Sequence, residues 1–260
     1  MTVQYAAGRL ELGAAGAGSR ALYDMRLRYD QSAATALHGY SPSENTLRVG
    51  AARASRMEFG RASEGAVDLR LARSVPLDLS LELGAVDATV DMTGLSVKRL
   101  VVDAGASETR VRFDSLNPIP METLEIHAGA ASMHVTGLAN AGVDDVTVEA
   151  GVGSVELDFD GEWTRDIAVA ANVGLGVLTI RVPSHVGIVL NVDELLASVD
   201  APGLTNHGEG HYMSENRDSA RYHVHIAAGA GVGAIHIERT GARQGRAAGR
   251  SAGTRGRGER

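Results

Sequence analysis

Short segments of alternating apolar and polar residues recur through the middle of the chain, and a glycine interrupts each of them. The five clearest segments are Leu77–Leu95, Val97–Phe113, Met121–Leu138, Val143–Gly161 and Ile167–Pro183. In each, a strand-like stretch leads to a glycine and a small residue, and a second strand-like stretch follows. Alternation with a period of two is typical of β-strands that bury one face. The pattern therefore predicts a repeat built from paired strands.

Aligning the segments on their glycines sharpens this repeat. The glycines are Gly84, Gly105, Gly129, Gly151 and Gly174, with spacings of 21, 24, 22 and 23 residues. Five residues before them stand Leu79, Leu100, Leu124, Val146 and Val169. A period of this size is typical of solenoids, in which one rung cannot bury its own apolar face and stacked rungs share a core. We expect glycine at each corner because it tolerates a positive φ, with a small residue beside it for close stacking.

The fold class predicted from these columns is all-β, a right-handed β-solenoid with rungs of about 21–24 residues and glycine corners. Stacked rungs place the residues of one column side by side, about 4.8 Å apart. Asp91 then lies beside Arg112, and Asp158 beside Arg181, and each pair favours the correct register.

The same pattern extends weakly beyond the regular rungs at 75–183. We expect degenerate rungs within 1–60, a polar loop at 193–221 and a final rung at 222–238, all in one domain, 1–238. The final rung has its corner at Gly231, because the sequence from Gly231 to Ile237 closely matches that from Gly151 to Leu157.

Composition narrows the possible chemistry. The chain has 260 residues, 44% of them hydrophobic but only 4% aromatic, so a core exists and must consist mostly of Val, Leu, Ile and Ala. It has no cysteine, which excludes disulfides, thiolate metal ligands and thiol catalysis.

Charge is divided unevenly between the body and the C-terminal segment. Residues 239–260 contain seven arginines and one glutamate (+6), which leaves residues 1–238 with 18 basic and 31 acidic residues (−13). An acidic body does not suit specific binding of duplex nucleic acid. We expect the Arg/Gly-rich tail at 239–260 to be disordered, with weak contact to anionic surfaces as one option.

No apolar run approaches the ~20 residues of a transmembrane helix. The first residues also lack the basic and apolar regions of a secretory signal. The expected location is the cytoplasm, with peripheral contact at the membrane as an option.

Four stretches resemble the bacterial toast-rack and LiaF-like C-terminal domains. They are VPLDLSLELGA at 75–85, DMTGL at 91–95, DAGAS at 103–107 and LDFDGEW at 157–163. The resemblance covers nearly all of 1–238. It implies a right-handed, stacked β fold without catalytic residues, in proteins connected with cell-envelope stress.

Histidines are the first candidates for a ligand site. His207, Glu209 and His211 lie in the expected loop and His223 follows it, a density that suits Zn or Ni. Gly208 and Gly210 argue against a helical metal motif. On the final strand, His223, His225 and His236 alternate with apolar residues, so we expect them to face solvent. No metal site is assigned, and these four residues stay candidates.

Two further patterns have structural interpretations. Glu156, Asp158 and Asp160 share one outer face; paired carboxylates serve glycoside hydrolysis, but an exposed strand gives no environment that raises a pKa. The glycines at 151–153 and 229–233 precede strands rather than the helix that a phosphate loop needs, so we interpret them as corners.

The sequence therefore predicts a non-enzymatic interaction or scaffold module, with no catalytic residues and no cofactor. Its partner is another protein or a second copy, and envelope-stress signalling is a possible setting. The alternative is a domain that binds, or hydrolyses, carbohydrate or a metal-dependent ligand through the histidine-containing loop at 193–225.

Overall fold

The computed structural model describes residues 1–241 except 33, 44–45 and 54–64. The elements within this described part are β1 (Thr2–Ala14), β2 (Tyr23–Arg28), β3 (Ala34–Ser41), β4 (Thr46–Arg53), β5 (Ala66–Leu71), β6 (Pro76–Asp91), β7 (Ser96–Ala104), β8 (Glu108–Arg112), β9 (Met121–Thr136), α1 (Leu138–Ala141), β10 (Val143–Asp158), β11 (Ile167–Pro183), β12 (Gly187–Asp200), β13 (Leu204–Asn206), β14 (His211–Ser214) and β15 (His223–Thr240).

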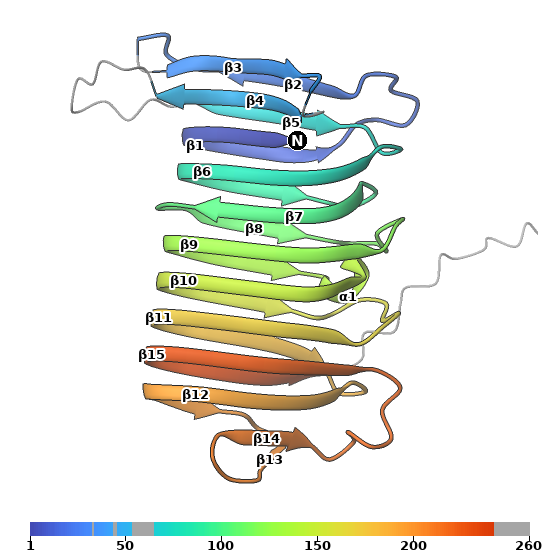
Figure 1. The fold of residues 1–260 in the computed structure, drawn as a ribbon, viewed down its shortest axis with the longest axis vertical. Coiled ribbons are helices and arrows are strands. Elements are labelled where there is room, and N and C mark those ends of the chain that lie inside the picture. The colour runs from blue at the N-terminus through green and yellow to red at the C-terminus, as the bar shows by residue number, and fades with distance from the viewer. Residues whose placement is uncertain (33, 44–45, 54–64, 242–260) are drawn as a thin grey trace, which may run out of the picture.

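Each long strand bends near its middle and continues in a second layer behind the first (Figure 1). The bends lie along one edge of the stack, on the left in Figure 1, and the loops between rungs lie along the other edge. We call the layer of the first strand halves the front layer and the other the back layer. In one rung the strand is interrupted at the bend, so that β7 forms its front half and β8 its back half. The all-β solenoid is confirmed, and its right-handed winding stays a prediction.

The register follows the columns expected from the sequence. Leu79 pairs with Leu100, Leu100 with Leu124, Leu124 with Val146, and Val146 with Val169, all between parallel strands. A shift of one residue would turn the apolar side chains of a rung to the outside, so burial fixes this register.

The core is a thin apolar layer between the two sheets. Alternating residues of every rung are buried there, as in the pattern eBeBiBeBieBeBeBi of β6. Aliphatic side chains supply most of it, and Phe113 and Phe159 are the largest fully buried side chains of the described residues. Trp163, in the loop after β10, stacks near Phe159 and donates its indole N–H to the Phe159 carbonyl oxygen. Phe113, Phe159 and Trp163 thus lie where rungs connect.

The N-terminal end differs from a simple series of degenerate rungs. Among the described residues there, β1 alone bends through both layers as one strand, and it pairs with β6 along nearly its whole length. β4 extends the front layer beside β1, and β5 extends the back layer. β3 and β2 then add antiparallel edges to the two layers. Part of the expected region at 1–60 lies outside the described residues.

The last long strand is inserted between two earlier ones. β15 pairs in parallel with β11 on one side and with β12 on the other, so the spatial order is β11-β15-β12 (Figure 1). The expected polar loop at 193–221 is therefore wrong in its first part. Residues 193–200 form the bend and the back half of β12, and β13 and β14 pair with each other below it. The sequence pattern did not predict this rung because its bend carries the polar Asp193 and Glu194 and has no glycine.

The expectation of disorder from residue 239 is wrong for the first residues of that segment. β15 continues to Thr240, and the Arg239 guanidinium donates hydrogen bonds to the carbonyl oxygens of Ser184 and Val186. Burial lowers the pKa of Arg239. These contacts hold the end of β15 against the turn between β11 and β12. Residues 242–260 lie outside the described residues.

Candidate interaction surface at the bent edge

Glycines form two columns at the bends, and each column requires glycine for a different physical reason. In the first column, a Cβ on Gly105, Gly129, Gly151, Gly174 or Gly231 would lie 2.6–3.0 Å from the carbonyl oxygen of the preceding glycine. None of the first-column glycines, Gly84 included, has a positive φ, so the expected reason for glycine at these positions was wrong. They are glycines because adjacent backbones approach too closely for a side chain.

The second column lies two residues further along and carries the positive φ angles. Gly153, Gly176 and Gly233 have φ values of 137°, 149° and 144°. They are lateral neighbours, and a Cβ on each would overlap the carbonyl oxygen of the strand beside it. L-residues rarely adopt this backbone conformation, so both conformation and space require glycine here.

An open polar groove runs along the front side of the bend. It has a volume of about 700 Å³, and Asp103, His127, Glu149 and Asn172 line it beside the first glycine column. Asp103 also lines a neighbouring groove of about 360 Å³ that reaches Gln4 and Glu82. His127 Nδ1 lies 3.0 Å from Asp103 Oδ1. The groove offers acceptors for hydrogen bonds and attracts cationic groups, but it does not enclose a small ligand.

An exposed aliphatic ridge lies at the bend itself. We define the ridge as Val152, Leu175, Val232 and Leu196, one residue from each of β10, β11, β15 and β12, with Val177 beside it. Val152 pairs with Leu175, Leu175 with Val232, and Val232 with Leu196, so the four form one continuous column. Their side chains are 49%, 53%, 46% and 73% exposed in that order. Contiguous exposed apolar surface of this kind marks interaction sites.

The ridge was missed by the sequence interpretation, which assigned a small residue to the position after each corner glycine. Ala85, Ala106 and Ala130 fit that rule, but Val152, Leu175 and Val232 occupy the same position in later rungs. The position points outward, so stacking does not limit its size. The change from alanine to valine and leucine along this column is the sequence signal that could have identified the ridge.

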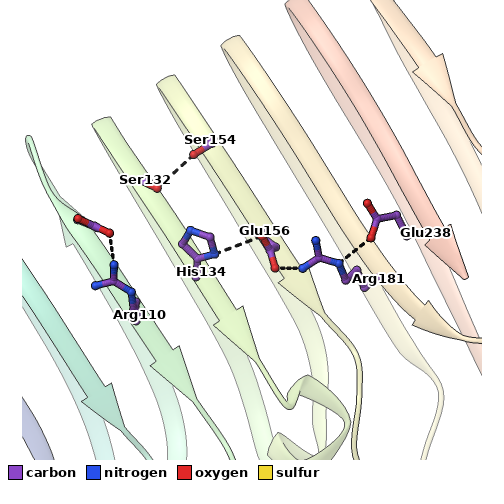
Figure 2. A network of polar contacts seen from close by, with 8 residues as sticks. Arg110, Ser132, His134, Ser154, Glu156, Arg181 and Glu238 are labelled. Atoms are coloured by element: carbon purple, nitrogen blue, oxygen red, sulfur yellow. Dashed lines mark hydrogen bonds and ion pairs between the residues drawn. The ribbon is translucent and has the colours of Figure 1, made fainter. Parts of the chain in front are cut away.

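The outer face of the back layer carries charges that pair with one another across the strands (Figure 2). His134 Nδ1 lies 3.3 Å from a Glu156 carboxylate oxygen, and the other oxygen of Glu156 contacts Arg181. Arg181 Nε in turn lies 2.7 Å from Glu238. The network thus links β9, β10, β11 and β15 and stabilises their alignment.

The two pairs of charged residues expected from register are lateral neighbours in the structure. Arg112 Nη2 donates to Asp91 Oδ2 at 2.5 Å, as predicted. Asp158 does stand opposite Arg181 in the register, but the guanidinium of Arg181 reaches back to Glu156 and across to Glu238. The expected acidic face of Glu156, Asp158 and Asp160 is therefore interrupted, because a cation and an imidazole contact Glu156.

The four metal candidates do not come together. His207 and His211 are near each other, with ring centroids 6.3 Å apart, and His211 Nδ1 lies 2.5 Å from Asn191 Oδ1. Glu209 occupies the exposed turn between them. His223 lies on another strand, where its Nε2 contacts the Arg217 carbonyl oxygen at 2.7 Å. In the part of the chain that the structure describes, no three His, Asp or Glu side chains converge to hold a metal ion.

The histidines of β15 follow the expected alternation. His225 is exposed, whereas His223 and His236 are half-buried beside Asp166 and Asp200 respectively. All three side chains therefore lie on the outer faces of β15, whose apolar residues alternate with them and face the core.

Two solved structures are similar to this chain over most of its length. One is a "putative cell adhesion protein" from Clostridium sporogenes, with 15% identity, a TM-score of 0.46, and coverage of 92% of this chain and 91% of that chain. Another is a "putative adhesin" from Bacteroides fragilis, with 13% identity, a TM-score of 0.43, and coverage of 91% of each chain. Comparison with curated proteins gave no match.

Among the described residues, no helix has the length and hydrophobicity needed to cross a bilayer.

The family model for the N-terminal domain of toast_rack (DUF2154) matches residues 1–117 and 115–181. Because these matches cover well over half of the sequence, as the resemblance at 75–163 led us to expect, the chain belongs to the toast-rack family.

Proposed function

We propose that this chain is a non-catalytic interaction module that binds a protein partner along its bent edge. The observation that carries the proposal is the ridge, where four aliphatic side chains on four adjacent strands are each about half exposed or more. Leaving such a continuous apolar column in water is unfavourable, and covering it with a partner recovers hydrophobic free energy.

The ridge is also presented on a rigid support. Val152, Leu175 and Val232 lie directly between the two glycine columns, where backbones of neighbouring strands are in contact. Leu196 pairs with Val232 from β12, which has no glycine at its bend. Pairing between neighbouring parallel strands holds its side chains about one strand spacing apart. Little conformational entropy is lost when such a pre-organised surface binds.

The proposal also includes a cellular setting for this function. A role in bacterial cell-envelope stress signalling is part of the proposal and is supported by the toast-rack resemblance. A cytoplasmic location, and weak contact of the segment 239–260 with anionic surfaces, are supported by the sequence pattern and charge. The alternative of carbohydrate or metal-ligand binding through 193–225 gains no support from the geometry, because His223 lies apart from His207 and His211.

The test is affinity capture from the native cell with three forms of the chain. These are the natural chain, Leu175→Asp on the ridge, and Ala170→Asp, which adds the same charge at an exposed position of the same strand. We expect one partner to be retained by the natural chain and by Ala170→Asp but lost with Leu175→Asp. Equal capture by all three forms would contradict a role for the bent edge.

A further inference from the structure

Resting on the proposed function, we propose that a second copy of this chain occupies the ridge. The two copies pair ridge to ridge about a twofold axis parallel to the stack, so that each ridge residue faces its own counterpart.

The periodicity of the ridge favours a copy of itself. Its side chains follow the spacing between strands, about 4.8 Å, over four strands. A second solenoid of the same chain presents the same residues at the same spacing. The two columns therefore stay in step over their whole length, as a twofold interface requires.

The area is sufficient for a reversible dimer. The exposed fractions of the four ridge residues and Val177 correspond to roughly 400 Å² of aliphatic surface per copy. Two copies would thus cover about 800 Å² before flanking groups are included, close to the ~1,000 Å² at which specific interfaces begin. We therefore expect a dimer whose population depends on concentration rather than an obligate one.

Charge beside the ridge selects the arrangement. On its front side lie the carboxylates of Glu149 and Asp193, each three residues before the ridge residue of its strand, β10 or β12. On its back side lie uncharged residues at the matching position, namely Ser154, Ala234 and Ser198.

A twofold axis parallel to the stack places the acidic side of one copy against the uncharged side of the other. The reverse, antiparallel arrangement would instead bring Glu149 of one copy toward Asp193 of the other. Like charges placed together across an interface oppose binding, so the parallel arrangement is favoured.

The first test measures molar mass by light scattering over a range of concentration. We expect the mass to rise from 27.1 kDa toward twice that value as concentration increases. Leu175→Asp and Leu196→Asp should each raise the dimer dissociation constant at least tenfold, and Ala170→Asp should leave it unchanged. Both leucines are more than half exposed, so the fold should survive, and the fluorescence of the buried Trp163 checks this.

The second test uses the absence of cysteine from the chain. Single variants Val152→Cys and Leu196→Cys should each form a disulfide-linked dimer under mild oxidation, because equal residues face one another. Ala170→Cys should not. A mixture in which 152 links mainly to 196 would overturn the proposed arrangement.

The two proposals can fail separately. A chain that stays monomeric at all concentrations and forms no disulfide overturns the self-association. If Leu175→Asp nevertheless removes a different captured protein, the proposed function stands with another occupant. If Leu175→Asp changes neither the mass nor the capture, both proposals fall.

Discussion

A Cβ atom on Gly231 would lie 2.6 Å from the carbonyl oxygen of Gly174, although the two residues are far apart in the sequence. The contact shows that β15 stacks on β11 as closely as consecutive rungs stack on each other. Substitutions in the two glycine columns should have different costs, because only the second column also has positive φ angles.

Gly176→Ala should destabilise the fold by about 2–4 kcal/mol, because alanine at a φ of 149° is strained and its Cβ would overlap backbone. Gly174→Ala should cost about 1–3 kcal/mol, because only the close approach opposes it. The measurement is urea unfolding followed by Trp163 fluorescence. Gly16→Ala is the control, since nothing lies within 4 Å of its Cβ and its φ is not positive; a cost for Gly176→Ala as small as for Gly16→Ala would refute the explanation.

Arg181→Met should lower the free energy of unfolding by about 1 kcal/mol, because it removes the cation between Glu156 and Glu238. The loss should shrink in 1 M salt, which screens the remaining charges. Lys98→Met is the matched control: Lys98 and Glu122 form an ion pair that is half exposed, and its loss should cost under about 0.5 kcal/mol. Equal losses for the two variants would contradict a structural role for the network.

Asp91→Asn should weaken the fold in a pH-dependent way. Partial burial raises the pKa of Asp91, but hydrogen bonds from Arg112 and Thr93 together bring that pKa below its ordinary value. A lowered pKa in the folded state stabilises the protein above the ordinary carboxyl pKa of about 4, and this contribution is lost as the pH falls through the folded-state pKa. The difference in stability between the natural chain and the variant should therefore be full at pH 7 and disappear under acid conditions.

The control for Asp91 is the same substitution made in an Arg112→Met background. With the main hydrogen-bond partner gone, Asp91→Asn should produce a smaller and flatter effect across pH, which a double-mutant cycle measures. An unchanged pH profile in that background would show that Arg112 is not the cause.

Truncation after Gly241 should leave the unfolding transition unchanged within about 0.5 kcal/mol, because β15 and the contacts of Arg239 end before that point. The truncated chain should lose binding to anionic vesicles at low salt, since residues 242–260 contain six arginines and one glutamate. Vesicle sedimentation measures the binding, and persistent binding by the truncated chain would assign the contact to the body.

Local alternation predicted much of the stack. The column that contains Leu79 and Leu100 could be predicted from the sequence. Side chains alternate between the two faces of a strand, so local alternation alone shows which face a residue occupies. The order of the last rungs could not be read in this way. Ile167 and Ile188 are 21 residues apart, the spacing of consecutive rungs, yet Val224 stands between them. The spacing of repeats along the sequence does not reveal that a later strand is inserted between two consecutive rungs.

The candidate surface was predictable only in part. Leu175 and Val232 visibly depart from the alanines at the same position in earlier rungs. Whether such residues face the core or solvent depends on how the chain turns at the bend, and the turn depends on backbone angles at Gly176 and Gly233. Those angles follow from stacking between rungs, so the exposure of the ridge is a property of the assembled solenoid rather than of one segment.

The position of β15 also constrains the order in which the molecule can be made. Rungs from β6 to β11 can be added in the order of their synthesis, each onto the one before it. β12 is translated directly after β11, but in the finished sheet it touches β15 and β14, both of which leave the ribosome later. The C-terminal rungs therefore cannot reach their final arrangement until translation has nearly ended, and a nascent chain stalled before residue 223 would carry β12 without its permanent neighbour.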